Sequence, residues 1–259
     1  MHDLRKSRRI KYFCKHIGKA ILRFNMIEDG DKIIIGVSGG KDSLSLCIAL
    51  VERKKWVPIN YELFAAMIEW KEYPYSEDQK KIFKYFFDKI GMNYKIIKAT
   101  MIHPNFKKNF NCYICSRNRK RILFTLASEM GVNKIALGHS LDDVVETTLM
   151  NLFFLGEFST MMPVQDFFQG KIKIIRPMCE VPEKEIIKIS KEINLPTIQV
   201  DCPNKKTNKR ILMKEIIARL SRVNKKTREN IYRAPWNINR EYLPFKVDSD
   251  FSTGIKNIF

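Results

Sequence analysis

The sequence predicts an α/β protein built on a five-stranded, parallel, doubly wound sheet, and two observations support this fold class. Short apolar runs alternate with longer stretches of helical periodicity, which is the pattern of a parallel sheet covered by helices. The first apolar run also leads through a glycine turn directly into a helical stretch, as at the ligand-binding edge of such sheets. The expected strands are Lys32–Val37, Tyr61–Ile68, Asn93–Lys98, Lys134–Leu137 and Ile172–Ile175.

Helices are expected between and after the strands. Gly91 and Gly131 are expected to end two of them, because glycine readily adopts the left-handed conformation at a helix C-terminus. The chain divides into a basic N-terminal helix in residues 1–27, an α/β core in residues 28–202, and a basic C-terminal helical region with a tail in residues 203–259. The expected helices are Leu4–Phe24, Asp42–Arg53, Ser76–Ile90, Cys115–Met130, Leu141–Leu155, Glu183–Ile193 and Asn208–Ser221.

The chain is strongly basic, with 47 Lys and Arg against 28 Asp and Glu and a formal net charge of +19. Most of the surplus lies in two segments, Arg5–Arg23 and Lys205–Arg240. Such a surplus attracts polyanions, so RNA, DNA and an anionic membrane surface are candidate partners, while solvated helix faces are the simpler alternative. No apolar stretch is long enough to span a bilayer, and the N-terminus lacks the apolar segment of a signal peptide. A cytoplasmic protein with no membrane partner is therefore expected.

A candidate anion-binding loop follows the first expected strand. Its paired glycines allow backbone N–H groups to approach an oxyanion, and the N-terminus of the following helix adds partial positive charge. Two serine hydroxyls and a lysine can add further donors, whereas the spacing differs from the Walker A pattern. A chance Gly-Gly turn is the alternative. The loop consists of Ser38, Gly39, Gly40, Lys41, Asp42 and Ser43.

The chain contains six cysteines, and two of them form a Cys-x-x-Cys pair. Cys112 and Cys115 stand beside a basic cluster at the expected start of a helix. This environment lowers a thiol pKa and favours metal ligation or sulfur chemistry. Cys202 is the candidate for a third ligand, since cysteine thiolates are the usual ligands of a four-iron cluster.

A structural zinc is the alternative for the same three cysteines. Its fourth ligand would be Cys179 or His139, because such sites are closed by four protein ligands. Cys14 and Cys47 lie in helical patterns and are expected to be packing residues.

A third cluster of polar residues follows the fourth expected strand, in residues 136–147. Ser140 and Asp143 have the spacing of an N-cap and its capping acid, which is a purely structural role. The adjacent carboxylates of Asp142 and Asp143 can also hold Mg²⁺ or a substrate amine at this edge of the sheet. Gly138 and His139 precede them as candidate nucleotide contacts, and His139 fits equally well as a packing histidine.

The loop resembles the PP-loop, Ser-Gly-Gly-x-Asp-Ser, of the N-type ATP pyrophosphatases, which split ATP between its α- and β-phosphates. Over residues 10–220 the order of motifs is similar to that of the tRNA 2-thiocytidine synthetases. Where that family usually has His-His-Arg-Asp-Asp, this chain has His-Ser-Leu-Asp-Asp in residues 139–143. The motifs that carry the resemblance are Ser38–Ser43, Cys112–Lys120, Ala136–Thr147, Arg176-Pro177, and Cys202 after Leu195-Pro196.

The resemblance implies a PP-loop ATPase core of the HUP or Rossmann-like type over residues 28–202, in an enzyme that thiolates tRNA. It implies that Cys112, Cys115 and Cys202 hold a [4Fe-4S] cluster and that Mg²⁺ accompanies ATP. It further implies 2-thiocytidine at position 32 of the anticodon loop as the product. The related 2-thiouridine enzymes carry extra zinc fingers at both ends, and six cysteines are too few for two such fingers and a cluster.

The expected mechanism begins with attack of a pyrimidine carbonyl oxygen on the α-phosphate of ATP, after which sulfur displaces AMP. Lys41, Asp42, Arg119 and Asp142 are the expected catalytic residues, because electrostatic stabilisation of developing charge is usually the largest catalytic effect. Mg²⁺ is expected on Asp42 and Asp143. The expected nucleotide contacts are Ser38, Gly39, Gly40, Lys41, Asp42, Ser43, Ala66, Met67, Gly138 and His139.

The expected partners are tRNA, held by the two basic ends, and a cysteine desulfurase or another sulfur donor, and a homodimer is left open. Two rival functions remain. A lysidine-synthetase-like PP-loop ligase would adenylate RNA but use an amine, and it would need none of the three cysteines. A non-catalytic basic RNA-binding protein would bind tRNA without releasing pyrophosphate.

Overall fold

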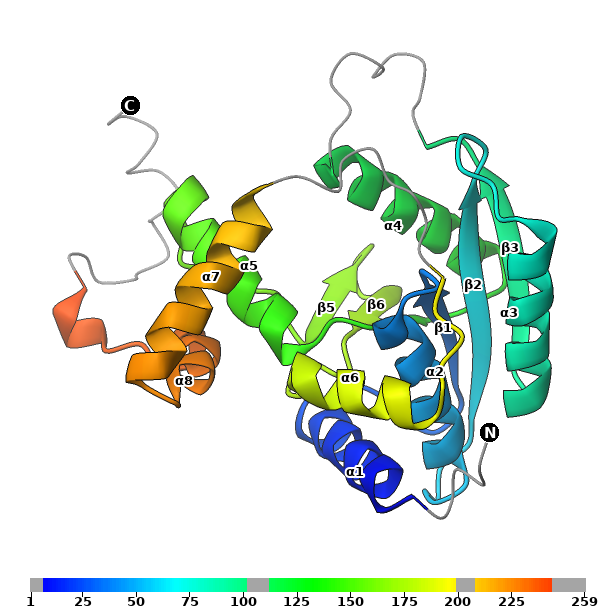
Figure 1. Ribbon diagram of the computed structural model, residues 1–259, viewed down its shortest axis with the longest axis horizontal. Helices are drawn as coiled ribbons and strands as arrows, with labels where there is room; N and C mark the ends of the chain where they lie inside the picture. Colours follow the sequence, from blue (N-terminus) through cyan, green and yellow to red (C-terminus); the bar gives the residue numbers. More distant parts are fainter. Residues whose placement is uncertain (1–6, 102–111, 199–207, 244–259) are drawn as a thin grey trace.

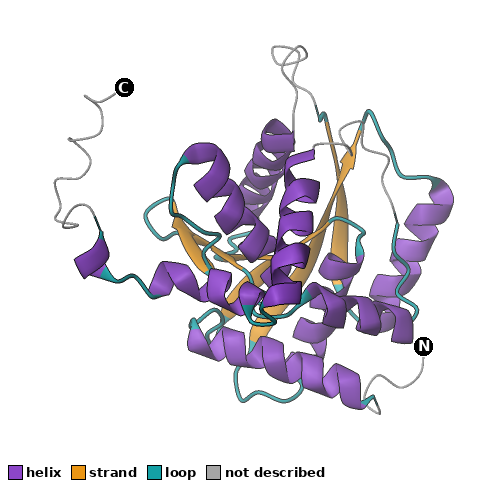
Figure 2. Ribbon diagram, turned by 60° about the vertical axis from the view of Figure 1, so that its left-hand side comes forward, coloured by secondary structure: helices purple, strands orange, loops and turns teal. Residues whose placement is uncertain are grey.

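The structure, a computed structural model, describes residues 7–101, 112–198 and 208–243. A single sheet runs through the molecule with helices packed on both of its faces (Figures 1 and 2). Its strands are β1 (Asp31–Val37), β2 (Tyr61–Trp70), β3 (Asn93–Ala99), β4 (Lys134–Leu137), β5 (Val164–Phe167) and β6 (Ile172–Ile175). Their order across the sheet is β3-β2-β1-β4-β6-β5.

The predicted doubly wound, parallel sheet is confirmed, and one strand is added to it. The five predicted strands pair in parallel, and the order reverses between β1 and β4, which places the expected ligand edge at their carboxyl ends. The sixth strand, β5, pairs antiparallel with β6. Its sequence, Val-Gln-Asp-Phe, is too short and too polar to indicate a strand by itself, so its pairing depends on the tight turn that joins it to β6.

The predicted helices are also present, and capping residues explain several of their ends. Ser76 and Ser140 each form a capping box, and Gly91 and Gly131 adopt the left-handed conformation with φ of 66° and 61°. One short helix after residue 226 was not predicted. The helices are α1 (Arg8–Arg23), α2 (Lys41–Lys54), α3 (Glu77–Ile90), α4 (Cys112–Glu129), α5 (Leu141–Leu155), α6 (Glu183–Glu192), α7 (Asn208–Val223) and α8 (Thr227–Arg233).

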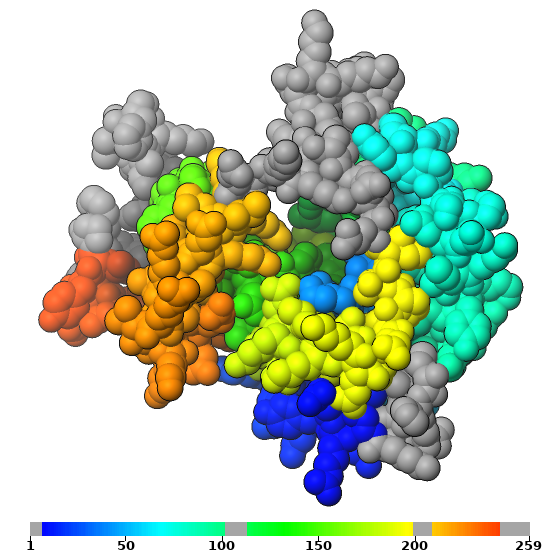
Figure 3. All heavy atoms as spheres, in the orientation of Figure 1, coloured from blue at the N-terminus to red at the C-terminus, as the bar shows by residue number. Residues whose placement is uncertain are grey.

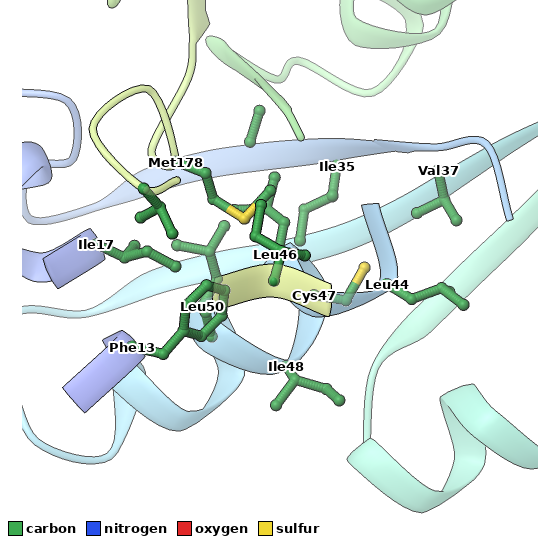
Figure 4. Packing of buried hydrophobic residues seen from close by; sticks show 14 of the residues in the cluster. Phe13, Ile17, Ile35, Val37, Leu44, Leu46, Cys47, Ile48, Leu50 and Met178 are labelled. Atoms are coloured by element: carbon green, nitrogen blue, oxygen red, sulfur yellow. The ribbon is translucent and has the colours of Figure 1, made fainter. Parts of the chain in front are cut away.

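The larger of two apolar cores covers one face of the sheet. Side chains of β1 such as Ile35 meet α2 there, and α1, α3 and α5 to α8 pack against the same cluster. Figure 4 shows Phe13 and Ile17 of α1 close to Leu46 and Leu50 of α2. Buried apolar area of this extent is the main source of folding free energy, so this face anchors the start of α2 firmly.

The smaller core covers the opposite face of the sheet. It contains Ile34, Ile135 and Ile174 from the strands, and Leu123 and Leu126 from α4. Among the helices that the structure describes, α4 alone contributes buried residues to this core. The carboxyl edge of the sheet is therefore bordered by many helices on one side and, within the described residues, by α4 alone on the other.

The predicted basic extensions belong to the larger core. Ile10, Phe13, Ile17 and Ile21 of α1 are buried, as the amphipathic pattern predicted, and Tyr232 of α8 is buried against the same cluster. Whether the predicted boundaries at residues 27 and 202 separate folding units stays a prediction. No helix within the described ranges is both long and apolar enough to cross a membrane.

Candidate nucleotide and sulfur-transfer site

Most of the predicted site residues converge on one cavity of about 490 Å³. It lies over the carboxyl ends of β1, β2 and β4, where the order of the sheet reverses. In Figure 3 the face toward the reader is hollowed between α6 and α7, and atoms coloured as the start of α2 are visible inside the hollow. The predicted residues that line the cavity are Ser38, Asp42, Ser43, Ala66, Cys115, Arg119, Gly138, His139 and Asp143.

The loop between β1 and α2 is fixed by hydrogen bonds within itself. The Ser38 N–H donates to Ser43 Oγ at 3.2 Å, and the Ser43 hydroxyl donates to the Gly40 carbonyl at 3.0 Å. Gly39 has φ of 81°, a conformation that disfavours any side chain. Gly40 is the N-cap of α2, so the loop presents the helix N-terminus to the cavity, as an anion-binding device requires.

Gly138 allows the end of β4 to approach this loop. A Cβ atom added there would lie 3.0 Å from the Ser43 nitrogen and 3.1 Å from the Asp42 carbonyl carbon. Because both neighbours are backbone atoms, any side chain at position 138 would displace the start of α2. Gly138 therefore packs closely beside the loop, and its predicted contact with the nucleotide stays a prediction.

Lys41 does not line the cavity, because carboxylates hold its ammonium group beside the loop. Its Nζ lies 2.8 Å from Glu183 Oε1 and 3.2 Å from Asp42 Oδ2. Burial lowers the pKa of Lys41, but Glu183 and Asp42 outweigh this effect and the net pKa is raised, so the side chain is cationic. Glu183, at the start of α6, was not predicted as part of the site.

Asp42 faces the cavity with one unsatisfied oxygen. Its Oδ1 is buried and has no hydrogen-bond partner among the described residues. Burial raises the pKa of Asp42, and the neighbouring Lys41 charge opposes this rise. A buried carboxylate oxygen without a partner is costly, so this atom is suited to accept a ligand hydrogen bond or a cation.

Of the two roles that the sequence left open for Asp143, the structure shows the capping one. Its Oδ2 accepts hydrogen bonds from the Ser140 N–H and hydroxyl, each at 2.9 Å, and thereby closes the capping box of α5. Its Oδ1 lies 3.4 Å from a guanidinium nitrogen of Arg210 on α7. The side chain also lines the cavity, so its structural role is established and its role as a magnesium ligand stays a prediction.

Asp142 is not among the residues that line the cavity. One carboxylate oxygen accepts the Glu183 backbone N–H at 2.6 Å, and the other accepts from Arg228 Nε at 2.9 Å. These bonds fix the first residue of α6 and tie α8 to α5. The geometry favours a positioning role, in which Asp142 holds Glu183 and Glu183 holds Lys41, and the predicted catalytic role of Asp142 stays untested.

The first half of α4 forms the opposite wall of the cavity. Cys115 and Arg119 lie one turn apart on this helix and both line the cavity. The guanidinium carbon of Arg119 lies 5.6 Å from the centroid of the Trp70 ring, and its buried Nε has no partner in the described part of the chain. Cys112 is the first residue of α4, and Cys202 lies outside the described residues.

Three further cations, Lys120, Arg176 and Arg210, line the cavity and were not assigned to the site from the sequence. Arg176, directly after β6, is 5% exposed; its Nη1 donates to the Met162 carbonyl, and burial lowers its pKa to about 10. Arg210 approaches from α7. The position of Arg176 at the carboxyl end of a parallel strand was a signal that could have identified it.

The imidazole of His139 is buried in this site among charged side chains. Burial, and after it the charge of Arg176, lowers the pKa of His139 to about 4, and its Nδ1 has no partner in the described ranges. The imidazole is therefore uncharged near neutral pH. It is suited to a neutral hydrogen bond with a ligand and not to charge pairing with a phosphate.

The predicted adenine contacts, Ala66 and Met67, lie before the end of β2. β2 continues to Trp70, and Ala66 and Met67 pair with Gly36 and Val37 inside the sheet. Ala66 lines the cavity, whereas Met67 is fully buried in the larger core. Ile68 also lines the cavity and follows the last pair with β1, which makes it an additional candidate for contact with the base.

The remaining described cysteines behave as packing residues. Cys47 is buried in the larger core, as Figure 4 shows, and Cys14 packs against the same core. Cys179 is fully buried there as well, whereas Cys115 packs against the smaller core on the opposite face of the sheet, so Cys179 does not fit the zinc-ligand alternative. Within the described ranges, no group of three or more His, Cys, Asp or Glu side chains is placed to hold a metal ion.

Fold and loop together define a nucleotide-binding domain of the PP-loop class. The sequence pattern of this family, described as "PP-loop domain", matches residues 6–219, and the chain belongs to that family.

Two curated relatives cover nearly the whole chain. A tRNA-cytidine(32) 2-sulfurtransferase from Polynucleobacter necessarius is 34% identical over 254 residues, which are 94% of this chain and 83% of the relative. One from Geobacter metallireducens is 34% identical over 248 residues, which are 93% and 94% of the two chains. Within the PP-loop class, the chain thus belongs with the tRNA-cytidine(32) 2-sulfurtransferases.

A solved structure with the same fold adds a second comparison. The U34-tRNA thiolase NcsA from Methanococcus maripaludis, solved with its [4Fe-4S] cluster, superimposes with a TM-score of 0.74 at 26% sequence identity. The match covers 89% of this chain and 80% of the thiolase.

Proposed function

We propose that this protein is an ATP-dependent tRNA thiolase that converts cytidine 32 of the anticodon loop to 2-thiocytidine. One observation carries the proposal: the PP-loop and Cys115 line the same cavity, so phosphate binding and sulfur chemistry share one space. The curated relatives that cover most of the chain are sulfurtransferases of the same nucleotide. A lysidine-synthetase-like ligase has no use for a cysteine at that position.

The reaction has two balanced steps. In the first, O2 of the cytosine attacks the α-phosphorus of ATP, the bond to the β-phosphate oxygen breaks, and pyrophosphate leaves with the electron pair. In the second, a sulfur nucleophile attacks C2, the C2–O2 bond breaks, and AMP leaves with the oxygen. The loop N–H groups, Arg119 and Arg176 surround the space in which negative charge develops during the first step.

Lys41 is proposed to exchange partners during this step. In the structure its ammonium group is held 2.8 Å from Glu183. A triphosphate beside the loop offers the same ammonium a more highly charged partner, so Lys41 would turn from Glu183 toward the phosphates. Asp142, which fixes the backbone of Glu183 at 2.6 Å, would set the starting position of this movement.

The site fits a magnesium ion through Asp42. Its Oδ1 is buried, lacks a partner in the described ranges, and lies on the cavity wall together with Asp143. Carboxylate oxygens are the protein ligands that Mg²⁺ prefers, usually one or two together with water and substrate phosphates. Asp42 and Asp143 would hold the ion, which supplies positive charge beside the phosphates of ATP.

The site also fits the predicted [4Fe-4S] cluster. Cys112 and Cys115 are separated by one helical turn at the start of α4, and Cys115 lines the cavity. The Ile198 N–H donates to the Gly39 carbonyl at 2.9 Å, so the chain lies against the loop four residues before Cys202. Four residues span at most about 14 Å. Held by these three cysteines, a four-iron cluster would keep one iron without a protein ligand, which would supply a position for inorganic sulfide.

The remaining partners follow from this chemistry. A cysteine desulfurase or another sulfur donor supplies the sulfur atom, and the cytoplasm, where tRNA is matured, is the proposed compartment. A homodimer is proposed as the assembly. The basic residues of α1 and of the segment from Lys205 to Arg240 are proposed to contact the tRNA backbone. The latter segment contains twelve basic residues and only two acidic ones.

A second candidate function is thiolation of uridine 34. It is favoured by one observation, the superposition on a U34-tRNA thiolase over 89% of the chain. Both functions share adenylation and sulfur transfer, so they differ only in the nucleotide that is presented to the cavity.

Anaerobic reconstitution tests the proposed reaction. The purified protein is supplied with iron, sulfide, ATP, Mg²⁺ and unmodified tRNA, and pyrophosphate and thiolated nucleosides are measured. We expect one pyrophosphate for each 2-thiocytidine formed, and no product from Cys115→Ser. Binding of tRNA without release of pyrophosphate, or pyrophosphate release that is indifferent to all three cysteines, would overturn the proposal.

A further inference from the structure

A second, larger cavity lies on the outer side of α4, away from the start of α2. Its volume is about 990 Å³, and it is bordered by α4 and by the hairpin of β5 and β6. Figure 1 shows α4 beside these two strands, and the rings of Phe124 and Phe167 confirm their contact at a centroid distance of 4.8 Å. This groove exists because α4 alone, among the described helices, covers that face of the sheet.

The charge of the groove is strongly positive. Its described lining contains Arg117, Lys120 and Arg121 from α4 and Lys171 from the turn before β6, against the single acidic residue Glu129. Arg117, Arg121 and Lys171 are exposed, and Lys120 is half-buried. Charges in this arrangement favour a polyanion with several phosphates.

Exposed aromatic rings are interspersed with these charges. Tyr113 is 72% exposed and Phe168 is 58% exposed. Phe168 stands in the hairpin turn with φ of 54°, a left-handed conformation that a bulky side chain rarely adopts. One edge of its ring packs against Phe124 at a centroid distance of 5.2 Å, and more than half of the side chain stays exposed beside the groove.

The groove and the nucleotide cavity lie beside the same helix, α4, and share two lining residues. Ser116 and Lys120 line both, and Cys115 and Arg119, which line the nucleotide cavity, lie on the same turns of α4. A strand that follows the groove therefore passes the rim of the site at which ATP and sulfur are proposed to act.

We infer that this groove binds an unpaired segment of the substrate RNA, with phosphates on Arg117, Arg121 and Lys171 and a base stacked on Phe168. This inference rests on the proposed tRNA thiolation. Unpaired RNA is favoured over a duplex because stacking on an aromatic side chain needs a base that is not already stacked in a helix. The groove would hold nucleotides next to the modified one while that nucleotide enters the cavity.

Two variants separate the contributions of charge and stacking. The double variant Arg121→Glu/Lys171→Glu removes two phosphate contacts, and its matched control is Lys95→Glu/Lys98→Glu, with the same change of charge on β3 at the opposite edge of the sheet. Phe168→Asn removes the ring while relieving the left-handed strain. None of these residues lines the nucleotide cavity.

The experiment measures binding of unmodified tRNA by fluorescence anisotropy at several salt concentrations, together with KM and kcat for tRNA thiolation. For the groove double variant we expect affinity at least tenfold lower and a salt slope smaller by about 1.4, which is roughly 0.7 for each single-strand phosphate that the variant no longer neutralises. For Phe168→Asn we expect about tenfold weaker binding and an unchanged salt slope. Both should raise KM for tRNA with less effect on kcat.

The outcomes that contradict the inference are distinct from failure of the proposed function. If wild-type protein neither binds nor thiolates tRNA, the proposed function fails. If wild-type protein thiolates tRNA and the groove variants match the β3 control in affinity and KM, the groove inference fails. It also fails if the variants bind tRNA normally but lose sulfur delivery from a donor protein, because the groove would then be a protein-docking surface.

Discussion

The two faces of the sheet differ in how they are covered, and this difference matches two demands on the site. One face packs against α1 to α3 and α5 to α8, whereas α4 alone among the described helices packs against the other. The heavily covered face holds the start of α2 and hence the phosphate-binding loop. The thinly covered face leaves a groove along α4, the helix that carries Cys115. The loop at the start of α2, where phosphates are expected, is thus held rigidly by the larger core. The groove along α4, where a large RNA has to enter, is open to solvent.

The largest expected effect is a loss of free energy of unfolding, and it can be compared between the two cores. Leu46 of α2 is fully buried in the larger core and Leu126 of α4 is 4% exposed in the smaller one. Leu-to-Ala substitutions in cores lower the free energy of unfolding by about 2 to 5 kcal/mol, depending on how far the surroundings can collapse. We expect about 4 kcal/mol for Leu46→Ala and about 2 kcal/mol for Leu126→Ala. Chemical denaturation measures both, and equal losses would contradict the unequal rigidity inferred for the two faces.

The next effect concerns the loop that the larger core supports. Lys41→Ala should lower the rate of pyrophosphate release about 100-fold, the size of effect seen when one stabilising donor is removed from a transition state. Lys54→Ala, in the last turn of the same helix, is the control and should leave the rate unchanged. A Lys41→Ala rate within about threefold of wild type would show that Lys41 stays on Glu183 throughout the reaction.

A pH effect of intermediate size is expected from Glu146, which is buried on α5. Burial raises its pKa to about 7; Lys214, whose Nζ lies 3.7 Å away, and Arg210 oppose this rise, and Asp143 and Glu183 reinforce it. Between about pH 4.5 and 7, Glu146 is protonated in the native protein but ionised in the unfolded chain. The free energy of unfolding therefore falls as pH rises through that range. Above about pH 7 this contribution to stability is gone.

Glu146→Gln should remove this pH dependence. The free energy of unfolding of the variant minus that of wild type is the quantity to compare. This difference should be larger at about pH 8 than at about pH 5, by on the order of 2 kcal/mol. Denaturant titrations at the two pH values measure the difference. Glu62→Gln, at an exposed position of β2, is the control, and an equal response from both variants would contradict the assignment to Glu146.

The smallest expected effect is at the contact between β4 and the loop. Gly138→Ala adds a Cβ atom 3.0 to 3.1 Å from backbone atoms of Asp42 and Ser43, so the loop has to shift by a few tenths of an ångström. We expect about a tenfold rise in KM for ATP, equivalent to about 1.4 kcal/mol, with little change in melting temperature. An unchanged KM would show that the loop tolerates this displacement.

The sequence predicted most of the fold because local signals and global topology agree. Four of the five parallel strands are mostly buried and appear as apolar runs, and Ser76, Ser140 and Gly91 carry recognisable capping signals. β5 was missed because its stability comes from pairing with β6 and not from its own composition. α8 was missed because a helix of seven residues has too short a pattern to recognise.

The site was predicted where function is encoded in contiguous motifs, and missed where it depends on distant contacts. Ser38–Ser43, Cys115 and Arg119 lie in such motifs, and most of these residues do share a cavity. The ion pair of Lys41 with Glu183 joins residues 142 positions apart, and no local pattern indicates it. The contacts of Asp142 were not predicted either: its place in a motif suggested chemistry, and its oxygens bind the start of α6 and Arg228 of α8.

Nucleoside and fragment mass spectrometry of tRNA tests the proposed reaction at its product. A strain that lacks its own thiolase receives this gene, or its Lys41→Ala or Cys115→Ser variant, and the tRNA is digested and sequenced by mass. We predict 2-thiocytidine in the fragment that contains position 32 with the wild-type gene, and none with either variant. Sulfur at uridine 34, or no thionucleoside with the wild-type gene, would contradict this assignment.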